Sequence, residues 1–411
     1  MTFNVYHFSS KVNAGIETSG YLSPTPIQKE AMPHILSGKD VMGLAQTGTG
    51  KTAAFVLPIL QRLLSGPGRK MRALILAPTR ELAEQTHNAI LSLGRKTGLA
   101  SMSIYGGVGI QQQIRRLKKG VDVVTACPGR LLDHINRGTI DLSNIEILVM
   151  DEADQMFDMG FFPDIRKIVK RLPADRQNLM FSATMPEDIK HLASEVLNDP
   201  VRIRIGHRVP VSTVSHSFYP VTTQSKNTLL LRLLTKSGTE SVLVFTRTKR
   251  RSQILAEHLE KAGHEATALH GNLSQSRRQK ALEGFRSGRY KILVATDVAA
   301  RGIDVRGISR VINYDMPATA VAYTHRIGRT GRADETGDAL TFVCGEDKGP
   351  LRAIQQMLGG KLKYVKIEGF ARPETALNER PNRWPASPKK NYRPRRASGQ
   401  GRHSTVFQVK R

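Results

Sequence analysis

Short apolar runs rich in β-branched residues alternate along most of the chain with longer stretches whose apolar residues have helical spacing. This alternation is typical of α/β folds, because neighbouring parallel strands need a crossover connection that is usually a helix. It therefore predicts parallel sheets flanked by helices. In the first half of the chain, strands are expected at Asp40–Ala45, Ala73–Ala77, Val121–Thr125, Ile145–Met150 and Asn178–Ser182.

The pattern pauses over residues 199–213 and then restarts, which indicates a domain exit followed by a short linker. Strands are expected in the second half at Ser241–Thr246, Ala266–Leu269, Lys291–Ala295, Arg310–Tyr314 and Ala339–Val343. With 411 residues, the chain is long enough for two domains that each bury a core. We expect one domain at residues 1–205, a linker at 206–214 and a second domain at 215–369.

The last part of the chain differs in composition from the rest. From about Phe370 the apolar pattern fades, and Pro381–Arg411 holds nine Lys and Arg residues and no Asp or Glu. Such a composition cannot bury a core, so a disordered basic tail is expected at residues 370–411. The alternative is a protein-docking segment anchored by Trp384, Tyr392 and Phe407.

The charge balance narrows the choice of partners. Against 35 Asp and Glu residues stand 62 Lys and Arg, a formal net charge of +27. This excess predicts a polyanionic partner, such as nucleic acid, an anionic membrane or an acidic protein, although it can also serve solubility alone.

Other classes of protein are disfavoured. The two cysteines, Cys127 and Cys344, are far apart, so neither a disulfide framework nor a cysteine-rich metal site is expected. The N-terminus lacks a secretory signal, and the longest apolar stretch, Ala53–Leu60, is too short to span a membrane. A cytoplasmic location is therefore expected.

A glycine-rich loop joins the expected strand Asp40–Ala45 to a helix. The loop, AQTGTGKT, consists of Ala45, Gln46, Thr47, Gly48, Thr49, Gly50, Lys51 and Thr52. Its glycines let backbone N–H groups close around phosphates at the helix N-terminus. Lys51 is then placed to reach the β- and γ-phosphates and Thr52 to hold Mg²⁺. The alternative, a chance glycine-rich turn, does not account for the strand and helix on either side.

Two adjacent acids, Asp151 and Glu152, follow the expected strand Ile145–Met150. Parallel α/β sheets bind ligands at the carboxyl ends of their strands. We therefore expect Asp151 to bind Mg²⁺, largely through water, and Glu152 to orient or deprotonate an attacking water. Two acids can instead cap the next helix, but that interpretation loses its force once a phosphate-binding loop lies upstream.

Further short motifs follow in order along the chain. They are GYLSPTPIQ (Gly20–Gln28) with Phe8 upstream, PTREL (Pro78–Leu82), GG (Gly106–Gly107), SAT (Ser182–Thr184), ATDVAARGID (Ala295–Asp304) and HRIGRTGR (His325–Arg332). Together with AQTGTGKT and DEAD (Asp151–Asp154), they resemble the DEAD-box ATP-dependent RNA helicase family over roughly Phe8–Asp347. The run after HRIGRTGR and the basic tail are similar to the bacterial RhlE-type subgroup. This resemblance implies two tandem RecA-like domains with ATP, Mg²⁺ and RNA bound across the cleft between them.

The resemblance also implies which residues bind the base and ribose of ATP, namely Phe8, Tyr21, Gln28, Gly302 and Asp304. The Gln28 amide combines a donor and an acceptor, which match the N6/N7 edge of adenine. Phe8 offers a ring face on which the base can stack. From the residues alone, two alternatives stay open: an ordinary glutamine at a helix N-terminus for Gln28 and a core position for Phe8.

By similarity, Arg329 and Arg332 stabilise charge on the γ-phosphate when the domains close. An arginine with this role is called an arginine finger. It supplies a planar cation with several donors, and it enters the site only in the closed state. A surface arginine cluster is the alternative. The resemblance implies coupling between the domains for Asp154, Ser182, Thr184, His325 and Arg326.

RNA contacts are implied in loops after the expected strands, where arginines and backbone amides can follow a phosphate chain. They are Pro78, Thr79, Arg80, Gly106, Gly107, Pro128, Gly129 and Arg130 in the first half, and Arg247, Gln275, Arg278, Thr296 and Asp297 in the second. At Cys127 a thiol replaces the family's usual threonine hydroxyl. Solvated loop charge is the alternative for each single residue. Aromatic residues make up 6% of the chain and none lies in these loops, so backbone and 2′-OH contacts are expected to dominate over base stacking.

The expected function is an RNA-dependent ATPase that locally opens short RNA duplexes or remodels RNA–protein complexes. A second interpretation is an ATP-gated RNA clamp or chaperone without productive unwinding, and a third is a DNA helicase on the same scaffold. The expected partners are RNA, bound largely without regard to sequence, and ribosomal-precursor or RNA-decay proteins. We expect a monomer and no membrane partner.

Overall fold

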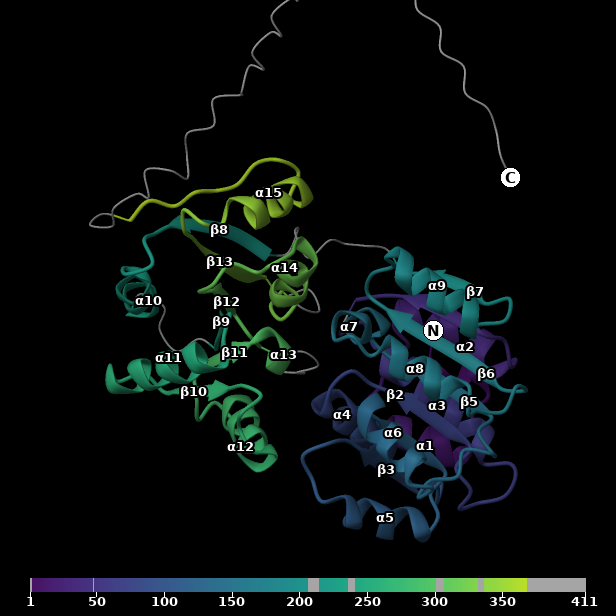
Figure 1. Ribbon diagram of the computed structural model, residues 1–411. Coiled ribbons are helices and arrows are strands. Elements are labelled where there is room, and N and C mark those ends of the chain that lie inside the picture. Colours follow the sequence, from purple (N-terminus) through teal and green to yellow (C-terminus); the bar gives the residue numbers. More distant parts are fainter. Residues whose placement is uncertain are drawn as a thin grey trace, which may run out of the picture. The chain divides into compact units, whose positions relative to one another are not determined.

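The computed structural model describes residues 2–46, 48–205, 214–235, 241–300, 307–331 and 336–367. Within these residues the chain forms two parallel sheets, each flanked by helices (Figure 1). The predicted α/β fold with two successive parallel sheets is thus confirmed. The predicted tail at 370–411 lies outside the described residues, and no helix among the described ones is long and apolar enough to cross a membrane.

The first sheet has seven strands in the order β3-β4-β2-β5-β6-β1-β7, all paired in parallel. The strands are β1 Val41–Leu44, β2 Ala73–Leu76, β3 Ser101–Ile104, β4 Val123–Ala126, β5 Ile147–Met150, β6 Gln177–Ser182 and β7 Val201–Arg204. A 3-10 helix, η1, lies at Phe3–Tyr6, and the α-helices are α1 Ser10–Thr18, α2 Pro26–Leu36, α3 Lys51–Leu63, α4 Arg80–Leu93, α5 Ile110–Lys118, α6 Pro128–Asn136, α7 Ala153–Asp158, α8 Phe162–Val169 and α9 Glu187–Val196.

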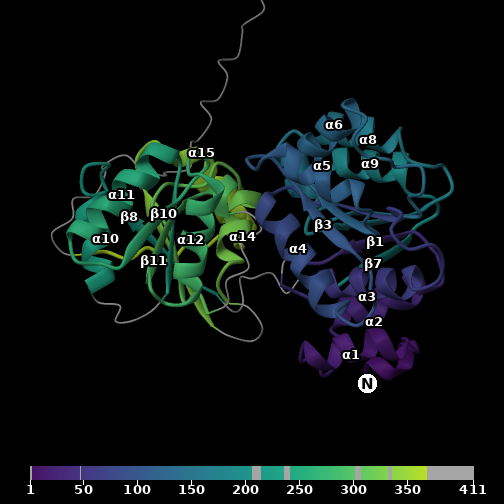
Figure 2. The ribbon, with the colours of Figure 1, turned by 90° about the horizontal axis from the view of Figure 1, so that it is seen from below.

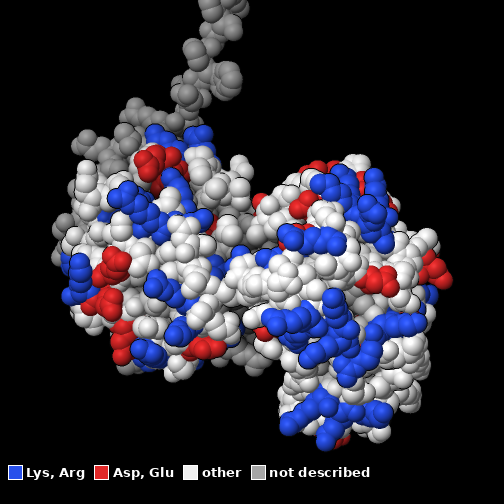
Figure 3. All heavy atoms as spheres, turned by 60° about the horizontal axis from the view of Figure 1, so that its bottom comes forward, with Lys and Arg blue, Asp and Glu red and all other residues white. Residues whose placement is uncertain are grey.

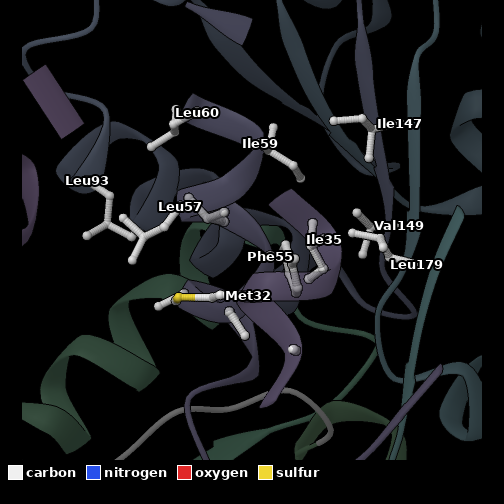
Figure 4. Packing of buried hydrophobic residues seen from close by; sticks show 14 of the residues in the cluster. Met32, Ile35, Phe55, Leu57, Ile59, Leu60, Leu93, Ile147, Val149 and Leu179 are labelled. Atoms are coloured by element: carbon white, nitrogen blue, oxygen red, sulfur yellow. The ribbon is translucent and has the colours of Figure 1, made fainter. Parts of the chain in front are cut away.

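Both faces of the first sheet are covered by helices. Figure 2 shows α2 and α3 on one side and α6, α8 and α9 on the other. Helix α3 is apolar along most of its length and buries Phe55, Leu57 and Leu60 in the core that it shares with α2, α4 and the sheet (Figure 4). A helix that is apolar on nearly all sides must be surrounded by protein. The loop that precedes α3 is therefore attached to a rigid, fully packed helix.

The second sheet has six strands in the order β10-β11-β9-β12-β13-β8, again all parallel. The strands are β8 Val214–Pro220, β9 Val242–Thr246, β10 Ala266–Leu269, β11 Ile292–Thr296, β12 Arg310–Asn313 and β13 Gly337–Val343. The helices are α10 Lys226–Thr235, α11 Lys249–Lys261, α12 Gln275–Arg286, α13 Asp297–Ala300, α14 Ala320–Ile327 and α15 Lys348–Met357. Apolar residues of α10 and α11 pack on one face of this sheet, while those of α12 lie in a separate cluster.

All ten expected strands are present, with ends that agree within two residues. Three further strands, β3, β7 and β8, were not expected. Each is an edge strand and includes polar residues, as in the sequence VRIR of β7. Strands β7 and β8 are partly exposed, so they lack the continuous apolar run by which a central parallel strand is recognised. Strand β3 is mostly buried, but two of its four residues are serines, which interrupt the run.

The expected linker at 206–214 needs one correction. Val214 pairs with Gly337 as the first residue of β8, where the burial of its side chain explains its place in a strand. Residues 206–213 lie outside the described residues.

Candidate functional site

The phosphate-binding loop predicted from AQTGTGKT follows β1 and ends at the N-terminus of α3. Lys51 is buried, and its Nζ donates a 2.9 Å hydrogen bond to the carbonyl oxygen of Ala45 at the other end of the loop. Thr49 Oγ1 donates to the carbonyl of Gln46 at 2.8 Å. Gly50 has a φ of +91°, in the left-handed region that favours glycine. The loop is therefore closed by a hydrogen bond between Lys51, in the first turn of α3, and Ala45. Thr47 lies outside the described residues.

Gln28 is fully buried in the first turn of α2, where its amide has two partners. Its Oε1 accepts from the backbone N–H of Thr25 at 3.0 Å, and its Nε2 donates to the carbonyl oxygen of Gly50 at 3.0 Å. A Cβ on Gly50 would lie 2.6 Å from that Nε2, so only glycine permits this approach. Gln28 therefore lies at a helix N-terminus, as the alternative interpretation expected, and it also contacts the phosphate-binding loop.

The two aromatic residues assigned to the base differ in exposure. Phe8 is only 5% exposed and belongs to the core cluster, with its ring 5.7 Å from that of Tyr6. Tyr21 is 38% exposed and meets the ring of Phe3 edge-on at 6.2 Å. Phe8 therefore occupies the core position that the sequence left open, whereas Tyr21 keeps a face toward solvent.

Asp151 and Glu152 directly follow β5, which lies in the same sheet as β1. Both are buried, and Asp151 Oδ1 has no hydrogen-bond partner among the described residues. Burial raises the pKa of the Asp151 carboxyl to about 7, although the charge of Lys51 acts in the opposite direction. Glu152 has a φ of +56° and accepts a hydrogen bond from Gln155 Nε2. A non-glycine residue in this left-handed conformation is strained, which is common at functional sites.

Asp154 connects the DEAD segment to the SAT segment. Its Oδ2 accepts from Thr184 N at 2.9 Å and from Thr184 Oγ1 at 3.0 Å, while Ser182 Oγ accepts from Asp154 N at 3.3 Å. His325 Nε2 lies 3.7 Å from the same Oδ2, an electrostatic contact longer than a hydrogen bond. Burial raises the pKa of Asp154, but its contacts with His325 and Thr184 and the charge of Lys51 outweigh this and lower it to about 2. Asp154 is therefore ionised, and its carboxylate is already hydrogen-bonded to the SAT segment.

Arg326 organises the carboxyl end of the second sheet. Its guanidinium donates to both carboxylate oxygens of Asp297, at 2.5 and 2.8 Å, and to Asn313 Oδ1 at 3.1 Å. It also lies 5.0 Å from the ring centre of Phe245. Asp297, expected among the RNA contacts, thus has both carboxylate oxygens committed to Arg326. Arg329 is 4% exposed and lines a small cavity with His325 and Arg326. Gly302, Asp304 and Arg332 lie outside the described residues.

Two of the arginines expected to bind RNA lie together in the first sheet's domain. A Cβ built on Gly106 would be 3.6 Å from Arg80 Nη2 and 3.9 Å from Arg130 Nη2, so both guanidinium groups face this glycine. Gly107 has a φ of +85°, and a Cβ there would lie 2.1 Å from Arg80 Nη1. Gly107 therefore leaves the space that the Arg80 head occupies, whereas a Cβ on Gly106 would only be in van der Waals contact with the two arginines. Thr79, just before Arg80, caps α4 by accepting from Leu82 N at 3.2 Å.

The remaining expected RNA residues of this domain lie near the same loops. Pro78 precedes Thr79 and is buried, while Pro128 and Gly129 form the first turn of α6. Cys127 is the N-cap residue of α6 and makes no side-chain cap hydrogen bond. Burial raises the pKa of the Cys127 thiol to about 12. The thiol is therefore an apolar, protonated group at a position where a threonine hydroxyl could accept from the helix.

In the second domain, the expected RNA residues have different environments. The side chain of Arg247 is 60% exposed, and its backbone N–H donates to Asp315 Oδ2 at 2.9 Å. Thr296 ends β11 and is 7% exposed. Gln275 Oε1 accepts from Arg80 at 3.4 Å, whereas Arg278 forms a 2.7 Å ion pair with Glu81 in which both side chains are 9% exposed. Both arginines therefore have a carboxylate partner, since Arg247 Nη2 lies 3.8 Å from Asp347 Oδ1, and Arg247 is the more accessible cation.

One residue that the sequence analysis missed stands out at this edge. Asp315 follows β12, is 2% exposed, and accepts from Lys226 Nζ at 2.9 Å and Arg251 Nη1 at 2.8 Å in addition to Arg247 N. Its backbone carbonyl accepts from Arg326 at 2.7 Å. The signal was available, because Asp315 follows the expected strand Arg310–Tyr314 just as Asp151 follows its own strand.

Family models match most of the described chain. The DEAD/DEAH box helicase model matches residues 25–192, and the helicase conserved C-terminal domain model matches residues 225–334.

Relatives extend the likeness to nearly the whole chain. The DEAD-box ATP-dependent RNA helicase CshA of Bacillus subtilis (strain 168) is 44% identical over 367 residues, which cover 89% of this chain and 74% of the relative. The CshA helicase of Listeria monocytogenes is 43% identical over 374 residues, covering 90% and 72%.

Solved structures share the fold. Dbp5 of S. cerevisiae, bound to RNA and ADP BeF3, superposes with a TM-score of 0.78 at 30% identity and covers 89% of this chain and 95% of its own. A DEAD box protein from the hyperthermophile Methanococcus jannaschii has a TM-score of 0.52 at 39% identity and covers 89% and 99%.

Proposed function

The chain belongs to the DEAD-box family of ATP-dependent RNA helicases, and we propose that residues at the carboxyl edges of its two sheets carry this activity. It hydrolyses ATP in response to RNA and locally opens RNA duplexes. The observation that supports the assignment most is the loop in which Lys51 Nζ donates to Ala45 O, in the same sheet as Asp151 and Glu152. A buried lysine in a glycine-rich loop, with its charge acting on the buried Asp151 carboxyl, suits phosphoryl transfer to water.

Within this site, each residue has a chemical task. Lys51 exchanges its bond to Ala45 for the β- and γ-phosphates, whose charge it stabilises. Glu152 orients the attacking water or takes its proton. Gln28 pairs with adenine, and Arg329 and Arg332 add positive charge to the γ-phosphate when the domains close.

The acids and hydroxyls of the site fit Mg²⁺. Asp151 has a buried carboxylate oxygen without a hydrogen-bond partner in the described part of the chain, and oxygen ligands are those that Mg²⁺ prefers. Asp151, largely through water, and Thr52 would hold the ion, which would supply positive charge to offset the negative charge that develops during hydrolysis.

RNA is held by its backbone in this proposal. Arg80 and Arg130, which both face Gly106, provide multi-donor cations suited to phosphates. Lys and Arg side chains are spread over much of the face in Figure 3, while Asp and Glu form smaller groups. Such a surface attracts a polyanion without reading its sequence. The other residues assigned to RNA binding lie in the second domain, where they would contact the RNA strand: Arg247, Gln275, Arg278, Thr296 and Asp297.

Finer assignments remain predictions. The CshA relatives do not carry the RhlE name, so the RhlE-like placement has no support from them. The first domain's limits 1–205, the end of the second domain at 369, the cytoplasmic location, the monomeric state and partners from ribosome assembly or RNA decay likewise rest on the sequence alone.

A paired assay tests the proposal. Phosphate release is measured with and without single-stranded RNA, and strand displacement is measured on a short RNA duplex, for the full chain and for Glu152→Gln. We expect RNA-stimulated hydrolysis and displacement from the full chain, and ATP binding without turnover from the variant. Stimulated hydrolysis without displacement would favour the RNA clamp, and equal stimulation by DNA would favour the DNA helicase.

A further inference from the structure

Helix α5 packs on its domain through a partly buried Leu117 and through one buried side chain. Its last turn carries Arg115, Arg116 and Lys118, and its single buried residue is polar, Gln113, which is 5% exposed. Helices normally anchor themselves with apolar side chains on the buried face. A buried amide in this position must have hydrogen-bond partners to offset the loss of water.

Gln113 has three such partners. Its Oε1 accepts from Arg130 Nη1 at 3.1 Å and from His134 Nε2 at 3.0 Å, and its Nε2 donates to the carbonyl oxygen of Tyr105 at 3.0 Å. One amide therefore joins α5 to the first and second turns of α6 and to the residue just before the GG pair.

The orientation of this amide is determined by its neighbours. Arg130 can only donate and the Tyr105 carbonyl can only accept, so the oxygen must face Arg130 and the nitrogen must face Tyr105. His134 is fully buried and must then donate from Nε2, while its Nδ1 lies 2.8 Å from Thr139 Oγ1. A flipped amide would lose the bonds to Arg130 and Tyr105 and would require the other tautomer of His134, which makes Gln113 a rigid support.

The support acts on an arginine expected to bind RNA. Arg130 Nη1 also donates to the carbonyl of Val108 at 3.1 Å, so its guanidinium is held between α5 and the loop that follows Gly107. Its other terminal nitrogen points toward Gly106, beside Arg80. A free arginine samples many rotamers, and ordering it on binding costs affinity.

We propose that Gln113, supported by His134, is a positioning residue that holds Arg130 ready for the RNA backbone before RNA arrives. This inference rests on the proposed RNA-binding role of Arg130. It adds to that role a residue on α5 that does not itself contact RNA or ATP.

Gln113→Met tests the proposal, because methionine has a similar length and no hydrogen-bonding amide. We expect the Kd for single-stranded RNA to rise by roughly two- to tenfold, the range for one side chain that must be immobilised on binding. The Kd for ATP without RNA and the ATPase rate at saturating RNA should stay unchanged. Gln111→Met, at an exposed position of the same helix, is the matched control and should leave all three quantities unchanged.

A double-mutant cycle separates positioning from a general structural role. If Gln113 acts through Arg130, Gln113→Met should weaken RNA binding in the native background and add little in an Arg130→Ala background. Independent, additive losses would overturn the proposal. Gln113→Asn, a shorter amide that withdraws from Arg130 and stays polar, serves as the second variant, and melting temperatures identify any variant that fails to fold.

Arg130→Ala alone distinguishes this inference from the proposed function. An unchanged RNA Kd in that variant would remove Arg130 from the RNA site and the inference with it. Weaker RNA binding by Arg130→Ala, together with normal RNA binding by Gln113→Met and Gln113→Asn, would overturn only the positioning role.

Discussion

Gln28 donates from its amide nitrogen to the carbonyl oxygen of Gly50 at 3.0 Å, so the first turn of α2 and the phosphate-binding loop share a hydrogen bond. The amide oxygen is likewise engaged, by the backbone N–H of Thr25. The side chain assigned to adenine is therefore also part of the loop's own support. Binding of a base requires the amide to exchange or share these bonds.

Gln28→Ala should weaken the binding of ATP more than the binding of GTP, because only adenine offers the paired donor and acceptor that an amide matches. A good bidentate pair is worth about 1–3 kcal/mol, so discrimination should fall by roughly tenfold or more. Kd values for both nucleotides measure this, with Lys29→Ala on the exposed side of the same helix as control. Equal losses for the two nucleotides would contradict the adenine assignment.

Lys51→Ala and Glu152→Gln should separate binding from chemistry. The first removes charge that stabilises the phosphates, so both ATP affinity and turnover should fall. The second keeps the size of the side chain but not its base, so ATP should stay bound while RNA-stimulated turnover drops by about a hundredfold or more. Glu187→Gln, on the exposed first turn of α9, is the control. Near-normal turnover in Glu152→Gln would mean that another group handles the water.

Both cysteines should react slowly with thiol reagents in the native protein. Cys127 and Cys344 are buried, and burial raises the pKa of both thiols, that of Cys127 to about 12. Only the thiolate reacts, so the rate at Cys127 should stay low between about pH 7 and pH 9 and rise only on unfolding. Site-resolved alkylation measures this, and rapid native labelling of Cys127 would contradict its buried environment.

His134 should make stability depend on pH. Burial lowers its pKa, and the nearby charge of Arg130 lowers it further. The unfolded chain binds a proton near pH 6.5, whereas the folded His134 resists it, so stability should fall as pH drops below about 6.5. His134→Gln cannot titrate. The gap in free energy of unfolding between the native chain and this variant should therefore be smaller at about pH 5.5 than at about pH 7.5. Denaturant unfolding at both pH values measures it, and a constant gap would contradict the lowered pKa.

Ending the chain at Arg380 should leave basal ATPase intact, because every motif lies before Asp347. RNA affinity should fall, since the removed segment carries nine cationic side chains and no acids. The slope of log affinity against log salt should become shallower by about 0.7 for each lost contact to a single strand. Binding titrations at several salt concentrations measure the slope, and identical slopes would point to protein docking instead.

The central strands and the nucleotide loop could be predicted from the sequence because their signals are local. A buried parallel strand such as β5 needs a continuous apolar run, and a phosphate loop needs glycines at set spacings before a helix. The edge strands β3, β7 and β8 could not, since polar residues interrupt their apolar runs, and β7 and β8 are also partly exposed.

The fold class, the order of the motifs and the residue types available for phosphate chemistry follow from the amino-acid sequence alone. The partners of those residues depend on the packing of the folded chain: Gln28 on Gly50, Arg326 on Asp297, and Gln113 between Arg130 and Tyr105. This is because a side-chain hydrogen bond needs a distance of about 3 Å between segments remote in sequence. Such distances are set by how helices and strands pack, whereas local patterns depend only on the neighbouring residues.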